Sequence, residues 1–172
     1  MRSEHEVAVR FTGEGTERGA VAPPRRIDDL DRQIIEALQV SGRESFRAIA
    51  ARIGVSEATV RARYTRLTAE GILQVVAVTN PLGLGFEQAI VGVKTSGPPS
   101  TVADEISRWS EADYVVVTAG QFDVIVEVVT AGRAELLELT NRMRALDGVV
   151  STETFLYLEM WKQLYDWGTR GN

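Results

Sequence analysis

Apolar side chains return at every third or fourth position over residues 30–39, which is the spacing of an amphipathic helix. Asp28 or Asp29 is placed to cap this helix, and Ser41 with Gly42 is placed to end it. The folded part of the chain is therefore predicted to begin with a short helix that packs through one apolar face.

The same spacing continues in residues 46–73, where it is interrupted at Gly54 and Val55. Glycine takes the left-handed conformation that ends many helices, and the hydroxyl of Ser56 can cap a new one. This segment is thus predicted to form two helices with a tight turn between them, a helix-turn-helix. The predicted core of the three-helix unit is Leu30, Ile34, Leu38, Ile49, Ile53, Val60, Tyr64 and Leu67.

After this unit the helical spacing ends. Residues 74–79 are predicted to form a short strand in the place of the wing of a winged helix. Residues 80–85 contain one proline and two glycines, so they are predicted to form a hinge.

From residue 86 the pattern indicates strand, helix, strand, strand, helix and strand. In chain order these elements are predicted at residues 88–95, 100–109, 114–118, 124–129, 134–145 and 152–160. The βαββαβ order is typical of a ferredoxin-like fold, with two helices on one face of an antiparallel sheet. The predicted fold class is α+β, an N-terminal winged helix-turn-helix domain followed by a C-terminal ferredoxin-like βαββαβ domain. The predicted segments are a flexible extension at 1–24, the helix-turn-helix domain at 25–73, a hinge strand and linker at 74–85, the effector-binding and oligomerisation domain at 86–160 and a tail at 161–172.

The predicted strands hardly alternate between apolar and polar residues, although one face of such a sheet has no helix over it. Val115 and Val117 lie on one face, and Tyr114 and Val116 lie on the other. An apolar face without a helix must be buried against another surface. The simplest such surface is a second copy of the same sheet, so the sequence predicts a homodimer through the C-terminal domain.

Charge is divided unevenly along this acidic chain, whose formal net charge is −5. Residues 25–71 carry nine arginines and seven acids, whereas residues 72–172 carry seven basic and thirteen acidic residues. The first segment is therefore net +2 and the second is net −6. This division favours contact of the helix-turn-helix with a polyanion such as DNA.

The composition excludes several other kinds of site. The chain has no cysteine and one histidine, His5, which lies in the predicted extension. Disulfides, thiolate metal sites and histidine metal sites are therefore not expected, and no cofactor is predicted. No apolar run approaches the roughly 20 residues that span a bilayer and no signal peptide is evident, so a cytoplasmic protein is expected.

The second helix of the predicted helix-turn-helix has an apolar face and an outer face rich in small residues and arginine. Such a helix fits the major groove of double-stranded DNA, where arginine binds phosphates or base edges. The predicted DNA-binding residues are Ser56, Glu57, Ala58, Thr59, Arg61, Ala62, Arg63 and Arg66. The alternative interpretation is an ordinary helical hairpin with a solvated arginine face.

In their order and spacing these motifs closely resemble the Lrp/AsnC (feast/famine) transcription regulators. The matching stretches are residues 30–35 with Leu38, 49–56, 59–63 with Leu67, 70–72, 120–123 and 150–154. The resemblance covers about residues 27–160, and it implies a DNA-binding domain followed by an effector-binding and oligomerisation domain. The departures from the family pattern are the N-terminal extension, Tyr64 in place of an aliphatic residue, and an aromatic tail with Trp161, Tyr165 and Trp167.

The resemblance also implies dimers that assemble further, often into tetramers of dimers, and an amino acid or related small metabolite as effector. The site that it implies lies at the turn formed by Gly120, Gln121, Phe122 and Asp123. Glycine lets the backbone approach a ligand closely, and successive N–H groups can hold a carboxylate. Phe122 can form an apolar wall, and Asp123 can bind an ammonium group or hold the turn. Thr152 and Thr154 can add hydroxyls from a neighbouring subunit, and a plain β-turn is the alternative interpretation.

The predicted fold is also compatible with two other classes of protein, an enzyme and an architectural DNA-binding protein. Small enzymes also use a ferredoxin-like domain, but acid–base chemistry needs a positioned group or pair in a pocket. Asp123 and Glu127 are about 13 Å apart if both lie on one strand, so an enzyme is not predicted. An architectural DNA-packaging protein without an effector needs the same helix-turn-helix and the same oligomer, and this alternative stays open.

Overall fold

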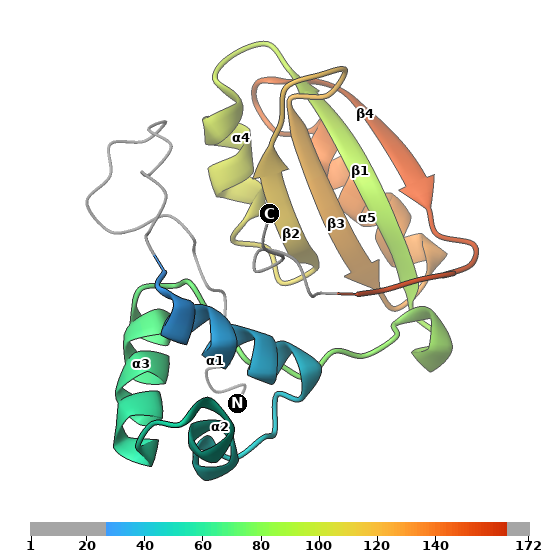
Figure 1. Ribbon diagram of the computed structural model, residues 1–172. Helices are drawn as coiled ribbons and strands as arrows, with labels where there is room; N and C mark the ends of the chain where they lie inside the picture. The colour runs from blue at the N-terminus through green and yellow to red at the C-terminus, as the bar shows by residue number, and fades with distance from the viewer. Residues whose placement is uncertain (1–26, 165–172) are drawn as a thin grey trace, which may run out of the picture. The chain divides into compact units, whose positions relative to one another are not determined.

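The computed structural model describes residues 27–164, which form two compact units divided between Val78 and Thr79 (Figure 1). Each unit is described by itself. The predicted extension at 1–24 and the aromatic residues Tyr165 and Trp167 lie outside the described residues.

Between residues 27 and 78 the first unit contains three helices, α1 (Asp29–Val40), α2 (Phe46–Ile53) and α3 (Glu57–Ala69). The Oδ1 atom of Asp28 accepts the Asp31 N–H at 2.8 Å, and Oδ2 of Asp31 accepts the Asp28 N–H at 3.1 Å, so α1 begins with a reciprocal capping box. Ser56 Oγ accepts the Thr59 N–H at 3.1 Å and caps α3. These polar side chains explain where the helices begin.

Gly54 ends α2 in the left-handed conformation, with φ 84°. This conformation strains residues that carry a Cβ atom, so glycine permits the tight turn before α3. The helix-turn-helix prediction is confirmed. Its predicted core is confirmed as well, because Ile34, Leu38, Ile49, Val60 and Leu67 are buried and the partly buried Leu30, Ile53 and Tyr64 pack against them.

The predicted wing strand is wrong. Residues 74–79 lie in no strand or helix, and Val75, Val76 and Val78 are exposed. An isolated strand leaves its N–H and C=O groups unpaired, and no other segment of residues 27–164 pairs with this one. The hinge that follows is a single 3₁₀ turn, η1 (Leu82–Leu84).

The second unit has the predicted ferredoxin-like order. Its elements are β1 (Glu87–Thr95), α4 (Pro99–Ile106), β2 (Ala112–Val117), β3 (Val124–Thr130), α5 (Arg133–Arg144) and β4 (Val149–Leu156). The strands form one antiparallel sheet in the order β2-β3-β1-β4 (Figure 1). The second strand begins two residues earlier than predicted, at Ala112, and a register shift separates Ala112 from Tyr114.

The last strand is displaced from the predicted range 152–160. It begins at Val149 and ends at Leu156, which pairs with Ala89 near the start of β1. One further backbone bond follows, from Tyr157 N to Gln88 O at 2.9 Å. Because β1 begins at Glu87, which lies opposite Leu158 in this register, residues beyond Leu158 have no residue of β1 to pair with.

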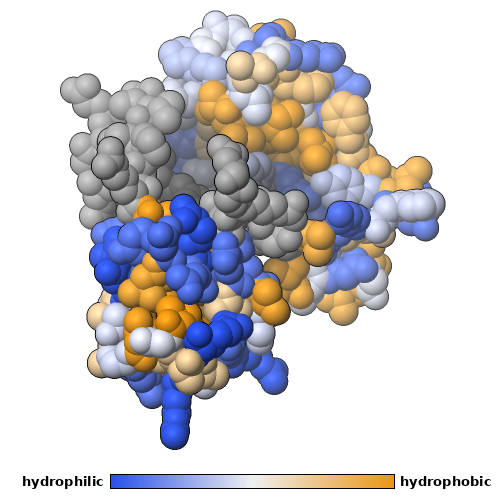
Figure 2. Space-filling model, in the orientation of Figure 1, coloured by the Kyte–Doolittle hydropathy of each residue, from blue (hydrophilic) through white to orange (hydrophobic). Residues whose placement is uncertain are grey.

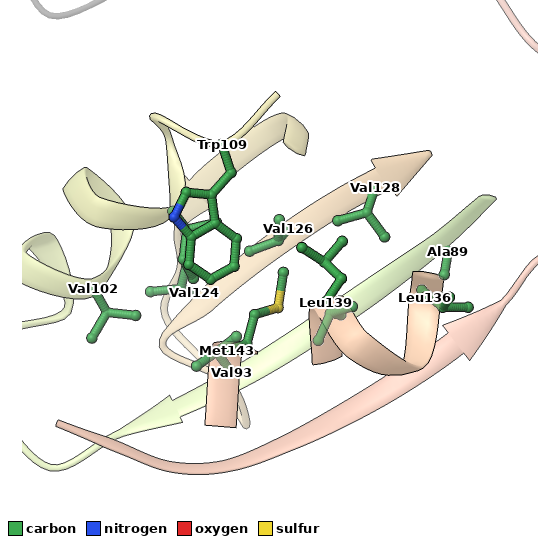
Figure 3. Packing of buried hydrophobic residues seen from close by; sticks show 12 residues of the cluster. Ala89, Val93, Val102, Trp109, Val124, Val126, Val128, Leu136, Leu139 and Met143 are labelled. Carbon is green, nitrogen blue, oxygen red and sulfur yellow. The ribbon is translucent and has the colours of Figure 1, made fainter. Parts of the chain in front are cut away.

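Both helices cover the same face of the sheet. Figure 3 shows Leu139 and Met143 of α5 packed near the valines of β1 and β3. The buried residues of this core are Ala89, Val91, Val93, Val102, Ile106, Trp109, Val124, Val126, Val128, Leu136, Leu139 and Met143. None of the helices within residues 27–164 has the length and apolar character needed to cross a membrane.

The other face of the sheet, the open face, has no helix over it. Val116 pairs with Ile125 and Phe155 pairs with Ile90, so these four apolar residues lie together there. Figure 2 shows hydrophobic residues gathered over the strands on this face. Tyr114 is 57% exposed and Phe155 is 46% exposed. The prediction that the strands are apolar on both faces is confirmed.

Candidate nucleic-acid interface and effector turn

The outer face of α3 is accessible to solvent. It is lined by Glu57, Ala58, Arg61, Ala62, Thr65, Arg66 and Ala69. These positions recur at intervals that place them on one side of a helix. The small side chains of Ala58, Ala62 and Ala69 leave the helix backbone close to the surface, which suits insertion into a groove of DNA.

Arg61 is the predicted DNA-binding arginine that lies most freely on this face. Its side chain is 62% exposed, and its Nη2 atom is 2.9 Å from Oε1 of Glu57, one turn earlier. Its guanidinium also lies 5.2 Å from the centre of the Phe46 ring. Both contacts are at the surface, so a phosphate can replace them at little cost.

Ser56 and Thr59 lie at the N-terminal end of α3 and bond to each other. Their hydroxyl oxygens are 2.8 Å apart, and the Ser56 hydroxyl also caps the helix. Ser56, Glu57 and Ala58 are exposed, whereas Thr59 is half-buried. Thr65 was not among the predicted DNA-binding residues. It lies on the same face as Arg61, four residues further along α3.

Arg63 and Arg66 do not point straight outward as predicted, although Arg66 still reaches the outer face. Arg63 Nη1 lies 2.6 Å from Asp28 Oδ2 and 3.1 Å from Asp31 Oδ1, and Arg66 Nη2 lies 2.5 Å from Asp31 Oδ2. Both side chains therefore turn back from α3 toward the start of α1. The direction predicted for them is wrong because helical spacing assigns a side chain to a face but does not reveal a buried acid on a neighbouring helix.

These ion pairs shift the pKa values of Asp28, Arg63 and Arg66. The Asp31 N–H and the Arg63 guanidinium hold the pKa of Asp28 below its ordinary value of 3.8. Hydrogen bonds to Asp28 and Asp31 raise the pKa of Arg63, and the bond to Asp31 raises the pKa of Arg66. Each shift favours the charged form, as expected for charge-assisted hydrogen bonds.

The turn at residues 120–123, the effector turn, connects β2 to β3. Gly120 has φ 157°, and its missing Cβ atom faces open space. Within residues 27–164, the N–H groups of Gly120, Gln121 and Phe122 donate to no backbone or side-chain acceptor. Three successive free N–H groups are a suitable arrangement for a carboxylate ligand.

Asp123 holds this turn against β1. Its Oδ2 atom accepts the Thr95 N–H at 2.8 Å, and its Oδ1 atom lies 3.0 Å from Lys94 Nζ. The Thr95 N–H and then the Lys94 ammonium lower the pKa of Asp123. Of the two roles predicted for this carboxylate, the contacts correspond to holding the turn.

Phe122 lies on the open face of the sheet, directly over Gly92. A Cβ atom added at Gly92 would lie 2.5 Å from Cδ2 of the Phe122 ring. The Phe122 ring also meets Phe155 edge to face, with 6.2 Å between the ring centres. Phe122 can therefore form an apolar wall between the effector turn and the open face.

Thr152 and Thr154 are on one face of β4 as predicted, but that face is the helix-covered one. They pair with Val93 and Val91, and Arg144 Nε donates to Thr152 Oγ1 at 2.8 Å. Within one chain they do not meet the Phe122 ring, which lies on the opposite face. Their contribution to a site stays a prediction that requires a neighbouring subunit.

Two protein-family models match the two units in turn. The AsnC-type helix-turn-helix domain matches residues 27–68, and the Lrp/AsnC ligand binding domain matches residues 88–166. The chain belongs to the Lrp/AsnC family. The family consists of transcriptional regulators, and a helix-turn-helix domain of this type implies DNA binding.

Similar regulators come from archaea and bacteria. An uncharacterized HTH-type transcriptional regulator of Pyrococcus horikoshii is 33% identical over 83% of this chain and 90% of its own length. The HTH-type transcriptional regulator FL11 of Pyrococcus furiosus is 32% identical over 80% of this chain and 93% of its own length. The crystal structure of the leucine response regulatory protein of Mycobacterium tuberculosis matches with a TM-score of 0.73 and 26% identity, over 80% of this chain and 96% of that one.

Proposed function

We propose that this Lrp/AsnC-family regulator binds double-stranded DNA sequence-specifically as a homodimer or larger assembly. We further propose that an amino acid or a related small metabolite, bound at the effector turn, changes its DNA affinity or its assembly. The observation that carries the DNA-binding part is the exposed outer face of α3, which includes Arg61. A helix of this shape fits a major groove, with arginine supplying contacts to phosphates or base edges.

The proposed dimer rests on the open face of the sheet. Besides its apolar residues, this face carries Gln88, which is 5% exposed, and Gln88 Nε2 donates to Glu127 Oε1 at 2.9 Å. Tyr157 donates its hydroxyl to the same oxygen at 2.8 Å. The Oε1 atom of Gln88 is buried without a hydrogen-bond partner among residues 27–164. A second sheet packed here can bury the apolar residues and bring a donor to this oxygen.

The proposed effector class rests on the effector turn. Its free N–H groups suit a carboxylate, and the Phe122 ring beside them suits an apolar side chain. A ligand with both groups has the chemistry of an amino acid. The match to a protein of Mycobacterium tuberculosis that is called a leucine response regulatory protein supports the same class.

A thermal-shift screen of the common amino acids, repeated with measurements of DNA affinity, tests the effector. A ligand present at about 100 times its dissociation constant is expected to stabilise the folded protein by roughly 2.7 kcal/mol. Gly120→Leu is expected to abolish the shift, because the new side chain occupies the space beside the free N–H groups. Gly132→Leu is the matched control, since Gly132 has an extended φ of 177° and open space around its missing Cβ atom.

Each other outcome of this screen decides against part of the proposal. If no amino acid or related metabolite changes stability, assembly or DNA affinity, the protein acts as an architectural DNA-binding protein. If a shift persists unchanged in Gly120→Leu, the protein has an effector but its site lies elsewhere.

A further inference from the structure

Asp31 is a buried carboxylate in the DNA-binding unit. It is 1% exposed, although it lies in the first turn of α1. It accepts hydrogen bonds from three donors, the Asp28 N–H at 3.1 Å, Arg63 Nη1 at 3.1 Å and Arg66 Nη2 at 2.5 Å. A carboxylate removed from water is tolerated when charged donors surround it in this way.

Two of these bonds join α1 to α3, and the third is the local cap of α1. Arg63 and Arg66 are one turn apart on α3, and both reach the same carboxylate. The buried Val60 and Leu67 determine which face of α3 packs on the core. Two contacts one turn apart add a further restraint on rotation about the helix axis, so the carboxylate of Asp31 helps to fix the angle at which the outer face is presented.

The same bonds occupy the two arginines. Arg63 also pairs with Asp28, and Arg66 also pairs with Glu70. About a third of each arginine side chain is exposed, compared with 62% for Arg61, which has only a surface contact to Glu57 and a ring contact. A DNA phosphate would have to displace a buried, multiply bonded carboxylate to reach Arg63 or Arg66, but only an exposed one to reach Arg61.

We propose that Asp31 is a positioning residue for DNA recognition, which orients α3 through Arg63 and Arg66 and keeps both arginines out of the set of phosphate contacts. The proposal rests on the proposed DNA interface on the outer face of α3. It assigns the phosphate contacts of this helix to Arg61 and gives Arg63 and Arg66 a role in sequence discrimination through orientation.

The test uses the full chain and a duplex that the unaltered protein selects from a random-sequence pool, with a scrambled duplex as reference. Affinity for both is measured over a range of salt concentrations for Asp31→Asn, Arg63→Ala, Arg66→Ala and Arg61→Ala. Arg61→Ala is expected to lower the salt slope by about 1 on both duplexes. Arg63→Ala is expected to leave the slope unchanged, whereas Asp31→Asn frees both arginines and is expected to make the slope steeper. Both changes are expected to reduce the preference for the selected duplex by about tenfold, which corresponds to about 1.4 kcal/mol.

The double variant Asp31→Asn with Arg63→Ala is expected to discriminate no worse than the poorer single variant, because both act through one contact. Arg63→Lys keeps the charge beside Asp31 and is expected to restore part of the discrimination. Circular dichroism melting of each variant shows that the measured protein is folded. If Asp31→Asn unfolds the unit, Arg63→Lys against Arg63→Ala still supplies the comparison.

Two results would overturn the positioning role alone. A lower salt slope for Arg63→Ala places this arginine on a phosphate in the unaltered protein. Unchanged discrimination in a folded Asp31→Asn protein also removes the role. If the unaltered protein binds no duplex at all, the DNA interface itself is wrong, and the positioning role falls with it.

Discussion

Gly92 is the residue on which the position of the Phe122 ring depends. Its missing side chain leaves room for the ring, since an added Cβ atom would lie 2.5 Å from Cδ2 and 2.6 Å from Cγ of Phe122. Gly92→Ala must therefore push the ring off the sheet, and overpacking of this kind typically costs about 1–3 kcal/mol of folding free energy. Chemical denaturation of the full chain measures the loss.

The matched control for this prediction is Gly97→Ala, because a Cβ atom at Gly97 meets no atom within 4 Å. This change is expected to leave stability nearly unaltered. Adding Phe122→Ala to Gly92→Ala removes the clash, so the double variant is expected to lose less than the sum of the two single changes. Strict additivity would mean that the two residues do not interact.

Whether the structural role of a residue could be predicted from sequence depended on how far along the chain its contacts lie. The caps Asp28 and Ser56 and the turn at Gly54 were predictable, because each acts on residues within one turn of itself. The direction of Arg63 was not, since its carboxylate partners lie 32 and 35 residues earlier in the chain. The spacing of residues along one helix does not predict a contact with a residue on another helix.

At the scale of elements, Asp123 ties the effector turn to β1, and this tie depends on pH. The Thr95 N–H and Lys94 lower the pKa of Asp123 in the folded protein below its ordinary value of 3.8. The unfolded chain therefore binds a proton more readily, and the stability from this carboxylate is present above pH 3.8 and is lost as the pH falls further. Asp123→Asn is expected to be less stable than the unaltered protein near pH 7, with a difference that shrinks toward pH 3.

Denaturation at a series of pH values measures this difference. Asp147→Asn, at an exposed aspartate in the turn before β4, is the control and is expected to follow the unaltered protein at each pH. A stability difference for Asp123→Asn that stays constant down to pH 3 would contradict the assigned tie, because an uncharged contact does not titrate.

The type and order of the elements were predictable from sequence, whereas two of their bounds were not. The wing expected at 74–79 fails because a short run of valines favours a strand but does not provide a neighbour to pair with. The last strand ends at Leu156, opposite Ala89 and close to the start of β1 at Glu87, although the apolar pattern continues to Met160. Strand ends are thus set by the partner strand as well as by the strand's own residues.

At the scale of the whole molecule, charge separates the two functions. Residues 25–71 are net +2 and residues 72–172 are net −6. The acidic part repels phosphates, so contact with DNA is expected to be confined to the first unit. The acids of the first unit reduce its positive field further, which favours recognition by the shape of α3 over binding by charge alone.

Assembly is the remaining property of the whole molecule, and it depends on the open face of the sheet. Val116 lies on this face beside Ile125, and it is expected to become buried when a second sheet packs there. The full chain should sediment at twice the mass of one chain or more. Val116→Asp places a charge in the buried interface, which typically costs several kcal/mol, so this variant is expected to sediment as a folded monomer.

Leu137→Asp is the matched control, because Leu137 is an exposed leucine on α5, and α5 packs on the opposite face of the sheet. The same change of an apolar residue to aspartate should leave assembly unaltered there. A stable monomer formed by the unaltered chain would contradict the dimer outright. Dissociation by Leu137→Asp with no effect of Val116→Asp would instead move the interface to the helices, and the apolar open face would then need another explanation.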